Sequence, residues 1–409
     1  MEASTTILSN GIGLIYLPSA SPVSYTGLLI NTGSRDEKPH EIGIAHMMEH
    51  MLFKGTLKRK PYHILTRIDD VGGELNAFTT KENTFLYAAF LKEYTSRAFE
   101  LLADITFHST FPQRELEKEK AVVIDEINAY RDDPSEEISD DFDQLVFRNH
   151  SLAENILGTP SSVSSFTSHS LHDFHKRTYT TDQMVLCYIG QHTFQEVIQE
   201  ACHYFERVPS SSRSFVRKKF SGYKPKTLIH EKDNHTCHGM MGNIAYPVKS
   251  KYRLAFYMLN HLLGGPSLNS RLNLNIREKF GLTYFLESNY TPFDDTGLWW
   301  VYYASDYRNF DRTRQLIRKE LNKLCCEGLG VIQLDKLKKQ VKGQLALASE
   351  SPSHLLHVAS RSFLLFRQFE SMQQTLKKVE KITSSDLMHV ANQVFDELQC
   401  SELMYVSKP

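Results

Sequence analysis

Two histidines and one glutamate in the segment Gly43 to Thr56 have the types and spacing that could bind and use a divalent metal ion. His46 and His50 are four residues apart, so a helix places both imidazoles on one face, where each can offer a ring nitrogen to the same ion. Glu49 falls on the same side and can act on a water molecule beside the metal. The pattern H-x-x-E-H is the inverted form of H-E-x-x-H, and both predict a zinc site with an adjacent base.

A zinc ion held by two histidines needs a third protein ligand, and a helix expected from Arg114 to Arg131 supplies candidates. Glu119 and Glu126 are seven residues apart, which is two helical turns, so they share a face. Glu126 lies within the apolar run 121–127, where a buried carboxylate needs a positive partner. The alternative for the histidine segment is an apolar core helix with hydrogen-bonded histidines.

The order of strands and helices predicts an α+β fold in both halves of the chain. Asn10-Gly11 is a hairpin signal between two short apolar runs. The second half repeats this rhythm, and its segment Leu259 to Gly264 resembles Met48 to Leu52 without the glutamate and one histidine. We therefore expect two similar α/β-sandwich domains, each an antiparallel-rich sheet flanked by helices, related by internal duplication.

A turn-rich and basic stretch divides the two halves, beginning at Pro209 and ending near Lys226. We predict a zinc-binding domain at residues 1–208, a linker at 209–226, and a second domain at 227–409 that lacks the metal site.

A short strand in the first half is a candidate for peptide binding. Gly72-Gly73 directly precedes it and lets another backbone approach closely. The segment is either an edge to which an extended peptide adds a strand or part of an ordinary hairpin, and the residues alone do not choose between these. Its members are Leu75, Asn76, Ala77, Phe78 and Thr79.

Composition excludes several classes of partner. The 409 residues include 47 basic and 48 acidic side chains, a net charge of -1, which argues against nucleic acid or an anionic membrane. No apolar run approaches the roughly 18 residues of a membrane span. The six cysteines form no C-x-x-C pair, and the first residues do not resemble a signal peptide, so we expect a cytoplasmic protein with free thiols.

The metal segment together with Glu126, 76 positions after His50, resembles the pitrilysin family of inverted zinc metallopeptidases. Within that family the chain is most similar to the half-length bacterial branch related to mitochondrial processing peptidase. The resemblance covers nearly the whole chain. It includes Gly33-Ser34-Arg35, His50 to Thr56, Gly72 to Ala77, Ser270-Arg271-Leu272, Arg277-Glu278 and Gly281 to Tyr284.

This resemblance assigns roles to the metal segment and to the second helix. It implies that His46, His50 and Glu126 bind one Zn²⁺ per chain and that Glu49 is the general base of a zinc metalloendopeptidase. Glu119 would then orient the site without binding the ion.

The resemblance also assigns roles to the second domain and to a partner. Arg277 and Tyr284 are similar to a pair that approaches the scissile peptide, although alone they would be interpreted as a surface arginine and a core tyrosine. Family members enclose short or unfolded peptides between two halves shaped like a clamshell. A half-length chain would therefore work as a homodimer or with a paralogous subunit.

Two alternative interpretations are non-catalytic: one retains the fold and the other retains the metal site. One is a catalytically silent scaffold or partner subunit, against which the intact motif argues. The other is a structural zinc site, which usually needs four Cys or His ligands. The remaining pairs and triplets with metal-like spacing are expected to be incidental; they are His172/His175 and His235/Cys237/His238.

Overall fold

The computed structural model describes residues 3–233 and 235–407, which form two compact units. The first unit consists of the chain up to Ala129, Glu154–Arg217 and Ala346–Met372, and the second of Tyr130–Ala153, Lys218–Leu345 and the chain from Gln373 onward. Over these described ranges, no helix has both the length and the apolar character needed to cross a membrane.

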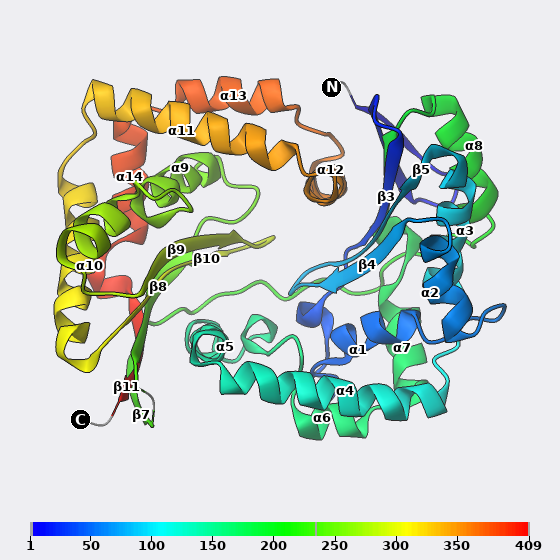
Figure 1. Cartoon of the computed structure of the whole chain (residues 1–409), viewed down its shortest axis with the longest axis horizontal. Helices are drawn as coiled ribbons and strands as arrows, with labels where there is room; N and C mark the ends of the chain where they lie inside the picture. The colour runs from blue at the N-terminus through cyan, green and yellow to red at the C-terminus, as the bar shows by residue number, and fades with distance from the viewer. Residues whose placement is uncertain (1–2, 234, 408–409) are drawn as a thin grey trace. The chain divides into compact units, whose positions relative to one another are not determined.

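The first unit is built on a six-stranded sheet in the order β1-β2-β6-β3-β5-β4, of which Figure 1 labels β3, β4 and β5. Its strands are β1 (Ser4–Ile7), β2 (Gly13–Pro18), β3 (Val23–Ile30), β4 (Glu74–Thr79), β5 (Thr84–Leu91) and β6 (Met184–Gly190). β2 and β6 are parallel, and the other neighbours are antiparallel. The predicted hairpin is confirmed between β1 and β2, where Gly11 has a φ of 98°.

Both faces of this sheet are covered, because successive residues of a strand point to opposite sides. Leu28 and Leu186 pack into the larger core, whereas their neighbours Leu29 and Val185 pack against the single helix α12 (Pro352–Phe366). The helices of the larger core are α1 (Ile44–Leu52), α2 (Pro61–Asp69), α3 (Thr95–Phe107), α4 (Gln113–Asp132), α6 (Pro160–Ser165), α7 (Ser168–Thr178) and α8 (Phe194–Phe205).

The second unit is built on a five-stranded sheet in the order β7-β11-β8-β10-β9. Its strands are β7 (Thr227–Lys232), β8 (Cys237–Ala245), β9 (Phe285–Pro292), β10 (Gly297–Ser305) and β11 (Ser401–Ser407). The main core lies against α9 (Arg253–Gly264), α10 (Tyr307–Cys326), α11 (Val331–Ser349), α13 (Met372–Lys381) and α14 (Ser384–Val394). The opposite face carries α5 (Pro134–Val146).

The two sheets share one topology, which confirms the predicted α+β duplication. In chain order β7 to β11 repeat β2 to β6, and each sheet contains one parallel pair, β2 with β6 and β7 with β11. The remaining neighbours in both series are antiparallel. β1 is the additional strand of the first copy.

The two units are not continuous segments of the chain. Each sheet is covered on one face by a helix that comes from the other half of the sequence. α5 comes from the first half and packs on β8 and β11, whereas α12 comes from the second half and packs on β2, β3 and β6. The chain also passes between the units at Arg217, inside the predicted linker 209–226. The predicted boundaries, 1–208 and 227–409, place α5 in the first domain and α12 in the second, whereas the compact units have these two helices the other way round. An amphipathic sequence does not specify which sheet its helix covers.

Candidate metal centre

Helix α1 holds the two histidines, and its start is fixed by the half-buried carboxylate of Glu37. Glu37 accepts hydrogen bonds from the backbone N–H groups of Gly43 at 2.9 Å and Ala45 at 2.8 Å. A carboxylate is favourable at this end of a helix because the helix dipole is positive there. Burial raises the pKa of Glu37, and these two N–H groups oppose the rise. The apolar residues of α1 lie in the core, which leaves the histidine face toward α4.

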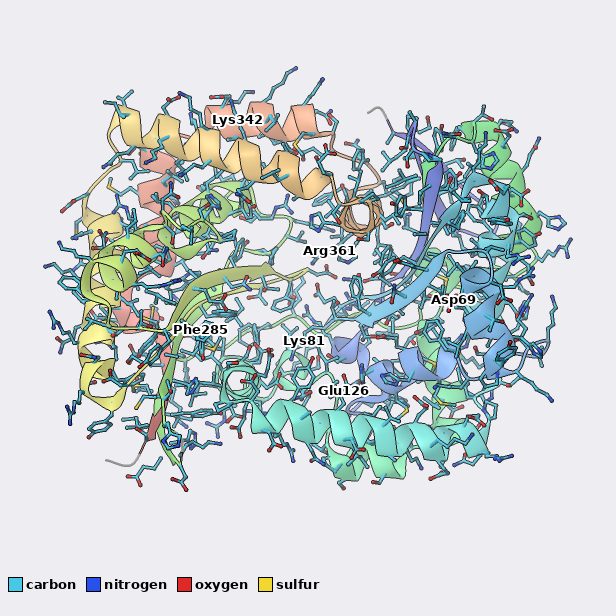
Figure 2. The ribbon with its side chains drawn as sticks, viewed as in Figure 1. Asp69, Lys81, Glu126, Phe285, Lys342 and Arg361 are labelled. Carbon is cyan, nitrogen blue, oxygen red and sulfur yellow. The ribbon has the colours of Figure 1, made fainter. Side chains whose placement is uncertain are left out.

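The structure brings together His46, His50 and Glu126 as the sequence predicts. Nε2 of His46 lies 3.8 Å from Oε1 of Glu126, and Nε2 of His50 lies 3.8 Å from Oε2 of the same carboxylate. The imidazole centroids are 4.6 Å apart. The potential ligand atoms of these three side chains all lie within 4.8 Å of one another. Among residues 3–233 and 235–407, they form the group of three or more potential metal ligands that converge in this way. Figure 2 labels Glu126 on α4.

The donor atoms suit zinc in type, protonation and spacing. A separation of 3.8 Å is too long for a hydrogen bond, yet two bonds of about 2 Å to one ion can span it. Burial, assisted by the nearby His50, lowers the pKa of His46 to about 3, so His46 is neutral and can bind metal at pH 7. Two imidazoles and one carboxylate leave a tetrahedral ion with an open position.

Glu119 orients His50 from the side opposite to Glu126. Its Oε2 lies 3.1 Å from Nδ1 of His50, so an Nδ1–H tautomer donates there and leaves the Nε2 lone pair directed at Glu126. Lys54 pairs with the other oxygen of Glu119 at 2.7 Å. No sequence signal identifies Lys54, because it follows the end of α1 at Leu52 and helical spacing does not place its side chain.

Glu126 reaches the histidines for a reason other than the one predicted. Its side chain is 32% exposed, and Val122 is 50% exposed, so the run 121–127 is not buried all round. Val123 and Ile127 are the buried residues of this turn. They anchor α4 in the core, and Glu126 emerges beside them.

Glu49 lies next to the metal-binding group without belonging to it. Its Oε2 accepts a hydrogen bond of 2.6 Å from Oγ1 of Thr79 on β4. Burial raises the pKa of Glu49, while the Thr79 hydroxyl and the charge of His50 lower it and the charge of Glu126 raises it. A partly buried carboxylate with a raised pKa is suited to accept and return a proton.

The segment from Leu75 to Thr79 is both a hairpin arm and a sheet edge. It forms β4, which pairs with β5 alone in the order of the sheet. A Cβ at Gly73 would lie 2.5 Å from the carbonyl oxygen of Ala89, which explains the glycine before the strand. The outer backbone of β4 is thus unpaired within its sheet, as an added peptide strand requires.

Arg277 and Tyr284 belong to the second unit. Arg277 lies in the π-helical stretch Asn273–Glu278, and Tyr284 precedes β9, where its backbone N–H bonds to the carbonyl of Ala304. Tyr284 is 65% exposed, so it is not the core tyrosine of the alternative interpretation. Their catalytic role stays a prediction.

The duplicate helix α9 carries a polar network at the position of the metal segment. Asn260 and His261 correspond to Glu49 and His50, and Asn260 accepts a hydrogen bond of 2.6 Å from Ser288 on β9. This bond matches the one between Thr79 and Glu49 in the first copy. The second copy therefore keeps the contact between strand and helix but has an amide in place of the carboxylate.

The other histidine groups make hydrogen bonds that explain their presence. Nε2 of His175 bonds to the carbonyl of residue 106 at 2.7 Å, and Nε2 of His172 bonds to that of residue 110 at 3.2 Å. His238 bonds to Tyr302, and Cys237 to Ser407.

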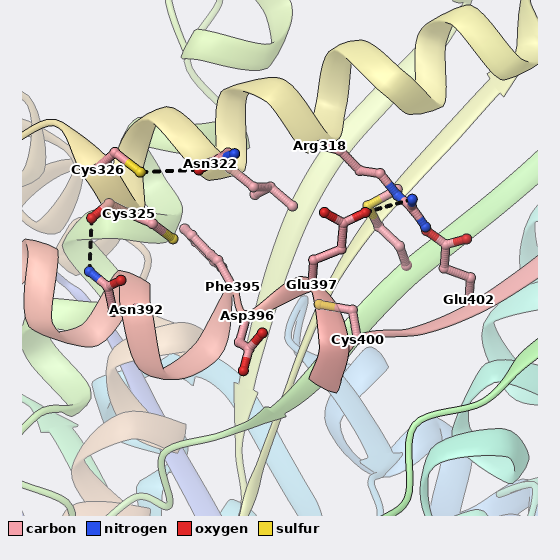
Figure 3. A pocket seen from close by; sticks show the side chains of 12 residues that line it. Arg318, Asn322, Cys325, Cys326, Asn392, Phe395, Asp396, Glu397, Cys400 and Glu402 are labelled. Atoms are coloured by element: carbon pink, nitrogen blue, oxygen red, sulfur yellow. Dashed lines mark hydrogen bonds and ion pairs between the residues drawn. The ribbon is translucent and has the colours of Figure 1, made fainter.

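A cavity of about 380 Å³ in the second unit is lined by three of the six cysteines, Cys325, Cys326 and Cys400 (Figure 3). Burial and nearby carboxylates raise the pKa of Cys400 to about 12, and burial with the neighbouring Cys326 raises that of Cys325 to about 11. These thiols stay protonated at pH 7 and are poor nucleophiles. All six cysteines are free.

Two family matches divide the chain at about the same place as its internal duplication. Residues 15–160 match the family described as insulinase (peptidase family M16). Residues 165–341 match the family described as peptidase M16 inactive domain. The first match contains the complete set His46, Glu49, His50 and Glu126, and the second contains the copy without metal ligands.

Similar proteins cover the chain almost end to end. The uncharacterized zinc protease YmxG of Bacillus subtilis is 32% identical over 371 residues, 91% of this chain and 90% of that protein. The uncharacterized zinc protease ML0855 of Mycobacterium leprae is 31% identical, with 96% and 89% covered.

Two solved structures share the fold. A protease from Helicobacter pylori aligns with a TM-score of 0.92 at 21% identity, with 100% of both chains covered. A peptidase M16 inactive domain from Pseudomonas fluorescens aligns with a TM-score of 0.93 at 17% identity, covering 100% of this chain and 98% of that one. At these identities the likeness establishes the two-unit architecture and nothing finer.

Proposed function

Because this chain belongs to peptidase family M16, the insulinase family, we propose that it is a zinc-dependent endopeptidase acting on short or unfolded peptides. The observation that carries the proposal is the convergence of His46, His50 and Glu126, with Glu49 beside them. Membership of the family agrees with the resemblance to pitrilysin-type metallopeptidases drawn from the motifs.

We assign the metal to the three converging side chains, one Zn²⁺ per chain. Zinc bound there supplies Lewis acidity, which lowers the pKa of water toward about 7 and polarises a peptide carbonyl. The neutral imidazoles of His46 and His50 donate lone pairs, and Glu126 supplies one negative charge. Glu119 holds the tautomer of His50 through its hydrogen bond at Nδ1.

We assign proton transfer to Glu49. Its carboxylate accepts the proton of the attacking water and then returns it to the nitrogen of the leaving amine, so one residue acts first as base and then as acid. The hydroxyl of Tyr284 and the guanidinium of Arg277 would stabilise the negative charge that develops on the carbonyl oxygen.

The peptide would lie extended along β4, at residues Leu75 to Thr79. Main-chain hydrogen bonds to an edge strand fix the direction of a peptide whatever most of its side chains are. This mode of binding favours short or unfolded chains, because a folded protein does not present a free strand.

We further propose that two copies form a homodimer enclosing the peptide, with Arg277 and Tyr284 of one copy serving the metal site of the other. A paralogous subunit could replace the second copy. The free cysteines favour a reducing compartment, for which we propose the cytoplasm.

The direct test is metal removal. The zinc-loaded protein is expected to cleave a quenched fluorescent peptide library, a chelator should abolish cleavage, and added Zn²⁺ should restore it. The match of residues 165–341 to an inactive domain leaves one rival open, a silent scaffold or partner subunit. That rival predicts zinc binding or peptide binding with no cleavage at any zinc concentration.

A shared active site makes a specific prediction for mixtures of inactive variants. Glu49→Gln and Tyr284→Phe are each expected to be nearly inactive alone. After coexpression, random pairing yields mixed dimers with one site that carries both changes and one intact site, so the mixture should recover about a quarter of the wild-type activity.

The matched control combines Glu49→Gln with Glu126→Gln. Both residues belong to the first unit, so every site in that mixture carries a defect and no recovery is expected. If the mixture with Tyr284→Phe also fails to recover, or if gel filtration finds a fully active monomer, sharing between copies is wrong.

A further inference from the structure

A half-buried hydroxyl on the last residue of β4, that of Thr79, is bonded to the carboxylate of Glu49. Oγ1 of Thr79 donates to Oε2 of Glu49 over 2.6 Å, within the short range of hydrogen bonds from a hydroxyl to an ionised acceptor. This donor comes from the strand proposed to bind peptide, whereas Glu49 comes from the helix that carries the histidines. The bond therefore joins the two parts of the proposed site.

The register of β4 explains why this hydroxyl faces α1. Side chains alternate along a strand, so Leu75, Ala77 and Thr79 share one side. Leu75 and Ala77 pack against the core that contains α1, whereas Phe78 packs against the core beneath α12. A shift of one residue would turn the hydroxyl away from Glu49.

Neighbouring groups direct the proton of Thr79 toward Glu49. Thr84 lies opposite Thr79 in the strand pair, 3.4 Å between hydroxyl oxygens, and donates its own proton to the carbonyl of Thr32 at 2.9 Å. The buried Tyr179 also faces this region. Burial raises the pKa of its hydroxyl and the charge of Glu49 adds to the rise, so Tyr179 remains neutral. Thr79 is thus the side chain whose hydrogen bond to Glu49 holds that carboxylate from the β4 side.

We propose that Thr79 is a positioning residue that fixes the side chain of Glu49 for proton transfer, and that it does so from the strand on which the peptide docks. The inference rests on the proposed peptidase function. Thr79 holds one carboxylate oxygen, which leaves the other free to face the attacking water. Because backbone and hydroxyl belong to one rigid strand, peptide docking and placement of the base depend on the same segment.

The duplicate unit supplies a matched control. Ser288 on β9 donates to Asn260 on α9 over 2.6 Å, which is the same strand-to-helix contact without a carboxylate. Ser288 is buried, more so than the half-buried Thr79, and its hydroxyl also accepts a hydrogen bond from the indole of Trp299. Its removal should cost stability through unpaired groups while leaving the base untouched.

The test compares Thr79→Val, Thr79→Ser and Ser288→Ala in the zinc-loaded full chain, with a cleavable fluorescent peptide. Thr79→Val keeps the shape and removes the donor, so kcat should fall about 10- to 100-fold, the loss expected for one hydrogen bond to a charged group. KM and the zinc dissociation constant should change less than about threefold, since neither peptide backbone nor metal ligands are altered. Thr79→Ser and Ser288→Ala should keep kcat within about threefold of the wild type.

Crystal structures of the zinc-loaded variants give a readout that does not depend on turnover. The carboxylate of Glu49 should keep its position in Thr79→Ser and leave it in Thr79→Val. Thr79→Ala is a second variant that removes the donor, for use where Thr79→Val does not fold. Undiminished kcat in Thr79→Val, equal loss in Thr79→Ser, or loss of zinc would overturn the inference, as would misfolding of both Thr79→Val and Thr79→Ala. An inactive wild type in which Glu49 still depends on Thr79 would instead refute the peptidase function and leave the positioning role standing.

Discussion

Glu49→Gln is expected to bind zinc as the wild type does and to lose peptide cleavage by about 10²- to 10⁴-fold, the usual contribution of a general base. The amide has nearly the same shape and can still accept the hydrogen bond from Thr79. It cannot take up the proton of the attacking water. Zinc content should remain one per chain because Glu49 lies outside the converging ligand group.

The measurement pairs metal analysis with cleavage of a quenched fluorescent peptide. Glu117→Gln is the control. This glutamate is exposed on α4, and in the described residues its side chain accepts hydrogen bonds from Lys120 and Gln113, which lie on the same helix. It should keep full activity. Equal turnover in Glu49→Gln and wild type would remove Glu49 from the mechanism, and loss of zinc would make it a ligand instead.

Glu126→Gln is expected to weaken zinc binding by more than about 100-fold, beyond the 10- to 100-fold typical of residues that only support a ligand. The amide is neutral, so it removes the one negative charge facing the Nε2 atoms of His46 and His50. Activity should fall with zinc occupancy and recover in part at high zinc concentration. Competition against a fluorescent chelator measures the affinity.

Asp125→Asn is the matched control for that change. Asp125 is the preceding residue of α4, is exposed, and has the same charge, yet it points away from the helix face shared by Glu119 and Glu126. A general charge effect on zinc binding would weaken both variants alike. The site as described requires the loss to be confined to Glu126→Gln.

The internal duplication is a feature of the fold that sequence similarity predicts only in part. The similarity between the segments around His50 and His261 predicted two related units, and the two sheets share order and pairing. The same pattern could not assign α5 and α12, whose apolar faces would suit either sheet. Only the packed structure determines that each of these helices covers the sheet of the other half of the chain.

Within the site, the sequence by itself determined the contacts that a single helix dictates. His46 and His50 meet because 3.6 residues form one turn, and Glu119 and Glu126 share a face for the same reason. These relations depend on local backbone geometry alone. They need no knowledge of the rest of the fold.

The tertiary structure decided every contact between elements. Packing of α4 through Val123 and Ile127 brings the Glu126 carboxylate to 3.8 Å from both imidazoles, and the pairing of β4 with β5 turns Thr79 toward Glu49. Such distances follow from how buried side chains fill the core across long separations in the chain, and periodicity in one segment carries no information about that packing.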